Sequence, residues 1–282
     1  MTDITIKNGL LTSITLHVED SGGPGRPVVL IHGWPLSGES WSEQTGPLAA
    51  AGYRVITYDR RGFGSSDKPK GLGTSGYDYD TLADDLHGLL TELDLNDVTL
   101  VGFSMGGGEV ARYASRHGNE RVRSVVFAGA VPPYLLKSDD NPDGPLDADT
   151  ASGFEAGVKN GREKFFDQFM TQFFSADGVL TVTEDQRQQA LALEAQADHR
   201  AELGCLNAFG TTDFREDLPK ITVPTLVVHG SSDAVVPFEG SGKRTHEAIA
   251  GSELVVVDGG PHGFNVSHAG ELNEALITFL AK

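Results

Sequence analysis

Residues 98–118 constrain the fold of this chain more than any other stretch. They open with the apolar and β-branched run VTLV, which is typical of a short buried strand. They close with side chains at helical spacing, and Gly118 is a typical helix stop. Between the two halves lies a G-x-S-x-G motif at residues 102–106. The stretch therefore predicts a strand that turns directly into a helix, with a serine at the turn.

The glycines of this motif are needed for steric reasons. A strand that turns at once into a helix crowds its backbone, so a side chain at Gly102 or Gly106 would clash with neighbouring elements. The turn would hold the Ser104 hydroxyl exposed above the helix N-terminus and leave the N–H of Met105 free to bind an oxyanion. The alternative is a glycine-rich loop that happens to contain a serine. The flanking strand and helix favour Ser104 as a nucleophile.

Strands and helices alternate through the first 130 residues, which is the signature of a parallel sheet covered on both faces. The expected strands there lie at residues 14–18, 28–31, 55–58, 98–101 and 122–127. The expected helices lie at residues 41–51 and 79–93, and a further helix follows Ser104. The same pattern returns later, with strands at residues 224–230 and 254–257 and helices at residues 242–250 and 269–280. The sequence therefore predicts an α/β fold with a mostly parallel, twisted sheet.

The alternation breaks at two consecutive prolines, where a polar and acidic segment begins. The pattern is then helical up to about residue 214. Phe166, Phe169 and Phe173 fall on one face of a helix at i, i+3 and i+7. Helix packing explains most phenylalanines in this region, but one or two could roof a pocket. We expect a helical cap inserted into the α/β core, with the cap at residues 132–218 and the core at residues 1–131 and 219–282.

A serine hydroxyl is a weak nucleophile at neutral pH, so it needs a base within reach and an acid that orients the base. Asp233 and His262 each follow an expected strand, on loops at the carboxyl edge of the sheet, where open parallel sheets place their sites. The chain order Ser104, Asp233, His262 is the one that accompanies such a serine turn. We expect these three residues to be a catalytic triad. Of the rival acids, Asp258 is too close to His262, and Asp213 lies in the insertion.

A tetrahedral intermediate needs a second N–H donor besides Met105. The sequence His32-Gly33-Trp34-Pro35 follows the expected strand at residues 28–31 and offers the backbone N–H of Trp34, whereas proline has none. The alternative is a tight turn with a buried tryptophan. We expect Trp34 and Met105 to form an oxyanion hole.

Other polar residues near these strand ends have structural interpretations. His32 and His229 each stand in a His-Gly turn and are expected to be hydrogen-bonded structural histidines. Residues 59–67 are rich in charge and are expected to hold the loop beside the oxyanion region. In that loop we expect Asp59 and Arg60 to pair locally.

Composition limits the partners and the chemistry. The chain has 22 basic and 40 acidic residues, a formal charge of −18, so we expect neither nucleic acid nor an anionic membrane as a partner. Cys205 is the only cysteine, which excludes an intrachain disulfide and a cysteine zinc site. No metal-ligand cluster or haem motif is visible, so we expect no metal and no cofactor. The N-terminus lacks the features of a signal peptide and no apolar run is of membrane-spanning length, so we expect a cytoplasmic location.

Together these motifs resemble the serine α/β-hydrolases, and more narrowly the cofactor-free bacterial haloperoxidases. The latter are also called non-haem chloroperoxidases or perhydrolases, and they have arylesterase and γ-lactamase relatives. The resemblance rests on HGWP at residues 32–35, YDRRGFGSS at 58–66, GFSMGGGEVARY at 102–113, Asp233 and the Pro261-His262-Gly263 sequence. It covers both halves of the expected sheet. The insertion carries no family motif, so the resemblance does not specify the substrate.

The resemblance implies hydrolysis of small carboxylic esters through an acyl-enzyme. It also implies perhydrolysis, in which hydrogen peroxide replaces water and releases a peracid that oxidises halide without haem or metal. The partners would be a small acyl substrate and hydrogen peroxide, and a homo-oligomer stays open because relatives often self-associate. We expect the substrate pocket to be lined by Phe103, Val235, Phe264, Phe166 and Phe169.

Two alternatives stay open. The same triad could cleave an amide or a γ-lactam. Cleavage of an epoxide or a haloalkane is disfavoured, because such enzymes need a carboxylate where Ser104 stands. A non-catalytic ligand receptor could also keep the pocket, although a pure binding site has no need of three such side chains.

Overall fold

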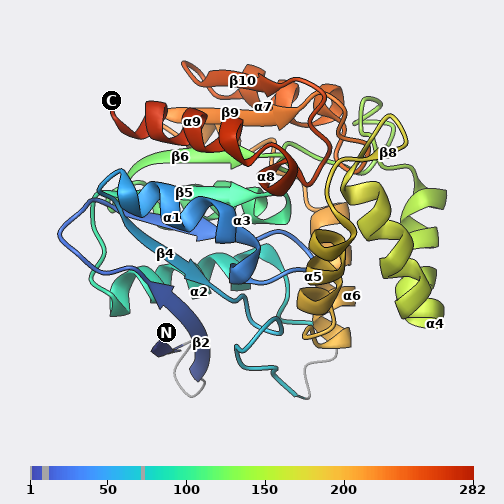
Figure 1. Ribbon diagram of the computed structural model, residues 1–282, viewed down its shortest axis with the longest axis horizontal. Coiled ribbons are helices and arrows are strands. Elements are labelled where there is room, and N and C mark those ends of the chain that lie inside the picture. Colours follow the sequence, from blue (N-terminus) through green and yellow to red (C-terminus); the bar gives the residue numbers. More distant parts are fainter. Residues whose placement is uncertain (1, 8–12, 71–73) are drawn as a thin grey trace.

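An eight-stranded sheet runs through the molecule in the order β1-β2-β4-β3-β5-β6-β9-β10 (Figure 1). The computed structural model describes residues 2–7, 13–70 and 74–282. The strands of this sheet are β1 (Thr2–Lys7), β2 (Ser13–Asp20), β3 (Pro27–Ile31), β4 (Arg54–Tyr58), β5 (Val98–Phe103), β6 (Val122–Ala128), β9 (Thr225–Gly230) and β10 (Glu253–Val257).

The sheet is parallel from β4 to β10 and antiparallel at its β1–β2 edge. The mostly parallel sheet expected from the sequence is therefore confirmed. β1 was not expected, because Ile4 and Ile6 are its only apolar side chains and only Ile6 is buried. β1 depends instead on its pairing with β2, residue by residue from Thr2 opposite Val18 to Lys7 opposite Ser13.

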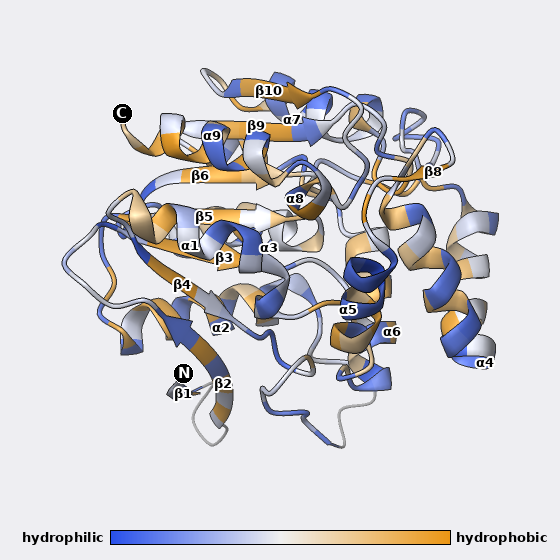
Figure 2. Cartoon of the chain, viewed as in Figure 1, coloured by the Kyte–Doolittle hydropathy of each residue, from blue (hydrophilic) through white to orange (hydrophobic). Residues whose placement is uncertain are grey.

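The central strands are made mostly of apolar residues, as Figure 2 shows by their colour. All six residues of β5 and all six of β9 are buried. This burial requires helices on both sides of the sheet. Figure 1 shows α1 (Ser42–Ala50) and α9 (Ala269–Leu280) in front of the sheet, with α2 (Tyr79–Glu92) and α3 (Met105–His117) behind it.

The remaining core helices are short. They are η1 (Gly38–Trp41), η2 (Leu218–Lys220), η3 (Phe238–Gly240), α7 (Gly242–Ala248) and α8 (Phe264–Ser267). The helix expected at residues 41–51 is α1, and the 3-10 helix η1 directly precedes it. No helix among the described residues is long and apolar enough to cross a membrane.

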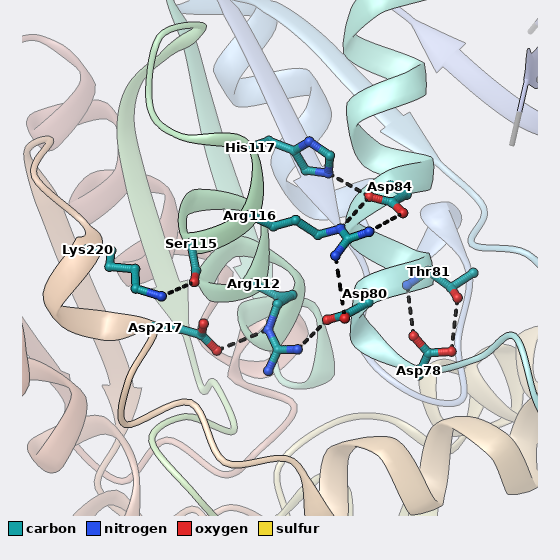
Figure 3. A network of polar contacts seen from close by, with 10 residues as sticks. All are labelled: Asp78, Asp80, Thr81, Asp84, Arg112, Ser115, Arg116, His117, Asp217 and Lys220. Carbon is teal, nitrogen blue, oxygen red and sulfur yellow. Dashed lines mark hydrogen bonds and ion pairs between the residues drawn. The ribbon is translucent and has the colours of Figure 1, made fainter. Parts of the chain in front are cut away.

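Ion pairs fasten α3 to α2 and to the segment before β9 (Figure 3). Arg112 pairs with Asp80 of α2 and, through its Nε at 3.1 Å, with Asp217. Arg116 binds Asp84 with two hydrogen bonds of 2.7 and 2.9 Å. The helix that follows Ser104 is therefore held along its outer face as well as by its packing on the sheet.

Three α-helices lie between β6 and β9 in the chain: α4 (Ala148–Phe173), α5 (Glu184–Glu194) and α6 (His199–Thr211). A two-stranded ribbon, β7 (Ser175–Ala176) and β8 (Val179–Leu180), joins α4 to α5. Figure 1 shows these helices beyond the carboxyl ends of the central strands. The helical character expected for this region is confirmed, and its boundaries as a separate cap stay a prediction.

Candidate active site

The serine turn is a strained backbone conformation. Ser104 has φ 53° and ψ −118°, and α3 begins at the next residue. A Cβ added at Gly102 would lie 2.4 Å from the carbonyl oxygen of Gly106, and one at Gly106 would lie 2.5 Å from that of Ile31. Only glycine fits at these two places, because real Cβ atoms do not approach backbone atoms so closely. The expected strand–turn–helix is therefore present.

Ser104, His262 and Asp233 form a continuous chain of hydrogen bonds. His262 Nε2 lies 2.9 Å from Ser104 Oγ, and His262 Nδ1 lies 2.6 Å from Asp233 Oδ2. An ionised carboxylate can only accept, so Nδ1 carries the proton and leaves the lone pair of Nε2 to accept from the serine hydroxyl. All three side chains are buried, with exposures of 6 % or less. The arrangement can draw the serine proton onto the imidazole during attack on a carbonyl.

The loop after β9 holds the carboxyl group of Asp233 in its ionised form. The backbone N–H groups of Val235 and Val236 donate to Asp233 Oδ1 at 2.9 and 2.7 Å. Burial alone would raise the pKa of Asp233, but His262 and His229 hold it well below its usual value. Asp233 therefore stays charged and fixed in orientation beside the imidazole.

The loop after β3 passes directly over the nucleophile. A Cβ at Gly33 would lie 3.1 Å from the Cβ of Ser104 and 2.8 Å from Cδ1 of Phe103. The first turn of α3 lies close to the end of β3, since a Cβ at Gly106 would lie 2.5 Å from the carbonyl oxygen of Ile31. The structure thus brings the loop that carries Trp34 next to Ser104 and Met105, and the oxyanion hole formed by the N–H groups of Trp34 and Met105 stays a prediction.

A buried ion pair supports the loop that carries Trp34. Arg60 pairs with Glu109 of α3, and Arg60 Nη2 donates to the carbonyl of His32 at 2.6 Å. Tyr58 Oη donates to the second oxygen of Glu109 at 2.9 Å. Arg60 and Glu109 are 1 % and 0 % exposed. The sequence offered no indication of Glu109 as a partner, because it lies 49 residues further along the chain.

The expected local pair between Asp59 and Arg60 is therefore wrong. Asp59 instead accepts from the backbone N–H groups of Gly38 and Ser65, each at 2.8 Å. His32 is hydrogen-bonded as expected: its Nε2 accepts from the backbone N–H of Arg60 at 2.9 Å. Burial and the nearby Arg60 hold the pKa of His32 well below its usual value, so its ring is neutral.

A cavity of about 240 Å³ opens above the serine. Ser104 and Trp34 border it from the core, and Phe154, Phe169 and Phe209 border it from α4 and α6. The remaining lining residues are Val131, Leu135, Pro145, Leu146, Thr150, Gln172, Ala234, Val235, Val236 and Pro237. The indole Nε1 of Trp34 donates to the carbonyl of Glu202 in α6 at 3.1 Å, which ties the loop to the helices above it.

Two of the five expected pocket residues, Val235 and Phe169, line this cavity, and the other three do not. Phe103 and Phe264 are 1 % and 0 % exposed and pack together with a ring separation of 6.0 Å, behind the triad. Phe166 is 0 % exposed and packs on the indole of Trp34. All three side chains are buried against neighbouring aromatic rings of the core and do not border the cavity.

No group of three or more His, Cys, Asp or Glu side chains among the described residues is arranged to hold a metal ion. Cys205 is fully buried, and this burial raises the pKa of its thiol to about 12. A thiolate at this site is therefore strongly disfavoured at neutral pH.

Comparisons with known proteins show the family to which this fold belongs. The alpha/beta hydrolase fold family matches residues 26–269. The chain is 45 % identical to the non-heme chloroperoxidase CPO-A1 of Kitasatospora aureofaciens over 263 residues, which is 92 % of this chain and 94 % of that protein. It is 34 % identical to the bifunctional esterase/perhydrolase DCH of Acinetobacter calcoaceticus, over 98 % of both chains. The chain also aligns with the crystal structure of a bromoperoxidase from Bacillus anthracis over 100 % of both chains, with 54 % identity and a TM-score of 0.94.

Proposed function

The chain belongs to the α/β-hydrolase family, and we propose that it is a serine hydrolase that cleaves small carboxylic esters through an acyl-enzyme. The single observation that carries this proposal is the hydrogen-bonded chain from Ser104 through His262 to Asp233. The order of these residues along the chain and their placement at the carboxyl edge of the sheet both support it.

In the first half of the reaction, Ser104 Oγ attacks the ester carbonyl while His262 Nε2 accepts the serine proton. The carboxylate of Asp233 stabilises the imidazolium that forms. The N–H groups of Trp34 and Met105 receive the oxyanion, and the N-terminal end of α3 adds a favourable dipole. The imidazolium then donates its proton to the alcohol, which leaves Ser104 acylated.

In the second half, His262 removes a proton from water, and the resulting nucleophile releases the carboxylic acid and restores the serine hydroxyl. Hydrogen peroxide in place of water would release a peracid by the same path. The peracid would then oxidise halide in solution, so no halide site is needed on the protein. The chloroperoxidase and esterase/perhydrolase names of the relatives support this second branch.

Ester turnover with and without hydrogen peroxide tests the proposal. We expect hydrolysis of short acyl esters, and peracid formation from the same esters when peroxide is added. Both activities should fall together in Ser104→Ala, since both pass through one acyl-enzyme. A protein that cleaves γ-lactams or amides but not esters would favour the alternative substrate class on the same triad. A protein that binds esters without turnover would favour a receptor.

Two further expectations stay predictions. The first is a cytoplasmic location, which fractionation of cells that make the protein would test. The second is self-association, which is expected because relatives often self-associate. Measurement of the molar mass in solution by light scattering would test it.

A further inference from the structure

A second cavity, of about 200 Å³, lies beside the catalytic cavity. It lies between the first turns of α4 and the far half of α6, next to the segment that leads from β6 into α4. Its lining residues are Leu136, Leu146, Ala151, Ser152, Phe154, Glu155, Leu203, Leu206, Asn207, Gly210 and Thr211. Neither the triad nor the oxyanion residues border it.

Two side chains, Leu146 and Phe154, line both cavities. Neighbouring residues of α4 divide between them, since Thr150 borders the catalytic cavity and Ala151 borders the second one. The two cavities are therefore adjacent compartments under the same pair of helices, and Leu146 and Phe154 form the partition between them.

The partition is held firmly in place. The Phe154 ring packs edge-on against Phe165 and Phe169, with centroid separations of 5.6 and 6.2 Å. The backbone of Leu146 is fixed on both sides, because its N–H donates to Leu135 at 2.9 Å and its carbonyl accepts from Lys137 at 2.8 Å. The Phe154 ring therefore cannot leave the partition without losing these ring contacts, and the Leu146 backbone cannot shift without breaking these hydrogen bonds.

The inner wall of the second cavity suits hydrocarbon. Leucines and an alanine form it, while the polar Ser152, Glu155 and Asn207 are exposed at its rim. Glu155 is paired with Lys159 on the same helix. An apolar chain end would find no buried charge there, and each methylene removed from water would favour binding about fourfold.

We propose that Phe154 and Leu146 set the length of the acyl group that the enzyme accepts, and that the second cavity is the site an apolar acyl tail occupies once the partition is shortened. This inference rests on the proposed esterase function. The native enzyme then prefers acyl groups that end at the partition, within the cavity of about 240 Å³ above Ser104.

The test compares kcat/KM for a series of esters that share one alcohol and differ in linear acyl length, from acetyl to decanoyl. Phe154→Ala should raise the ratio of kcat/KM for the long acyl groups to kcat/KM for acetyl about tenfold or more. Leu146→Ala opens the partition from its other side and should shift the profile in the same direction.

Phe165→Ala is the matched control. It removes the same atoms from the same helix and the same aromatic cluster, but Phe165 borders neither cavity. Phe165 supports the Phe154 ring but fills no space in either cavity, so the acyl profile of Phe165→Ala should shift much less than that of Phe154→Ala. A second control refills the space: Gly210 lines the second cavity, and a Cβ there would make an ordinary contact of 3.5 Å with Leu146. In the Phe154→Ala background, Gly210→Val should return the profile toward the native one.

The outcomes separate the two proposals. Native ester turnover with an unchanged acyl profile in folded Phe154→Ala and Leu146→Ala would overturn the partition and leave the esterase function standing. An equal shift in Phe165→Ala would also overturn it, since a general loosening of α4 would then be the cause. Absence of ester turnover in the native protein would overturn the esterase function itself, and the partition with it.

Discussion

Arg60 and Glu109 place a buried ion pair one loop away from the nucleophile. The pair joins two parts of the candidate oxyanion hole, because Glu109 belongs to the helix that begins at Met105 and Arg60 holds the carbonyl of His32. A buried pair of this kind contributes little net stability, but removal of one partner leaves an uncompensated charge. We therefore regard Arg60 and Glu109 as positioning residues for the Trp34 loop.

Glu109→Gln should lower kcat about tenfold to a hundredfold with little change in KM, since a displaced donor weakens only the binding of the oxyanion. The neighbouring pair of Arg61 and Asp85 gives the control, because it is buried to a similar degree and does not contact His32. Asp85→Asn should destabilise the fold comparably, by about 3–5 kcal/mol, and keep kcat.

Affinity for a boronic acid, which forms a tetrahedral adduct on the serine, distinguishes positioning from simple destabilisation. It should weaken in Glu109→Gln in proportion to kcat and stay native in Asp85→Asn. Tyr58→Phe, which removes only the 2.9 Å bond to Glu109, should act in the same direction with a smaller effect. Equal losses of boronate affinity in the two pair variants would contradict the assignment.

At the scale of the elements, the serine turn and the helices above it respond oppositely to added side chains. Gly106→Ala should destabilise the fold by about 3 kcal/mol, because its Cβ would meet the backbone of β3. Gly153→Ala, in α4, should stabilise it by about 0.5–1 kcal/mol, since a Cβ there meets nothing within 4 Å and glycine is costly inside a helix. Denaturant midpoints measure both, and a loss of stability in both variants would contradict the geometry of α4.

The helices above the site share a buried acidic pair. Arg162 of α4 binds Glu194 of α5 and Glu202 of α6, each at 2.6 Å. Burial raises the pKa of Glu194 to about 8, and the neighbouring Glu202 adds to this despite Arg162. The folded protein therefore holds a proton here that the unfolded chain releases near pH 4.5.

This proton makes stability fall as pH rises from about 4.5 to 8, since the folded state binds more protons over that range. The full difference between the pKa of Glu194 in the folded and the unfolded protein would correspond to about 5 kcal/mol of unfolding free energy. Solvent screening reduces the expected loss of stability to about 2 kcal/mol. Glu194→Gln should remove this loss and be more stable than the native protein at pH 8 but not at pH 5. Glu155→Gln, at an exposed pair of α4, is the control and should leave the pH dependence unchanged. If the stability of Glu194→Gln kept the native pH dependence, protonation of Glu194 would not be its cause.

At the scale of the whole molecule, local patterns predicted what depends on local physics. The run VTLV and the glycines after it predicted β5 and the serine turn, and chain order together with strand ends predicted which acid and which histidine meet Ser104. The partner of Arg60 could not be predicted, because a buried ion pair depends on which elements pack together. The pocket was predicted only in part, since helical spacing shows that Phe166 and Phe169 share a face but not that one packs on Trp34 and the other borders a cavity.

The central claim is that Ser104, alone among the serines of the chain, is activated for attack on a carbonyl. Reaction with a fluorophosphonate, followed by mass spectrometry of the digested protein, tests it most directly. We expect one covalent adduct on Ser104, complete loss of ester turnover in step with its formation, no adduct in Ser104→Ala, and turnover reduced about a million-fold in that variant. An adduct on another residue, or a Ser104→Ala protein that keeps its ester turnover, would contradict the account.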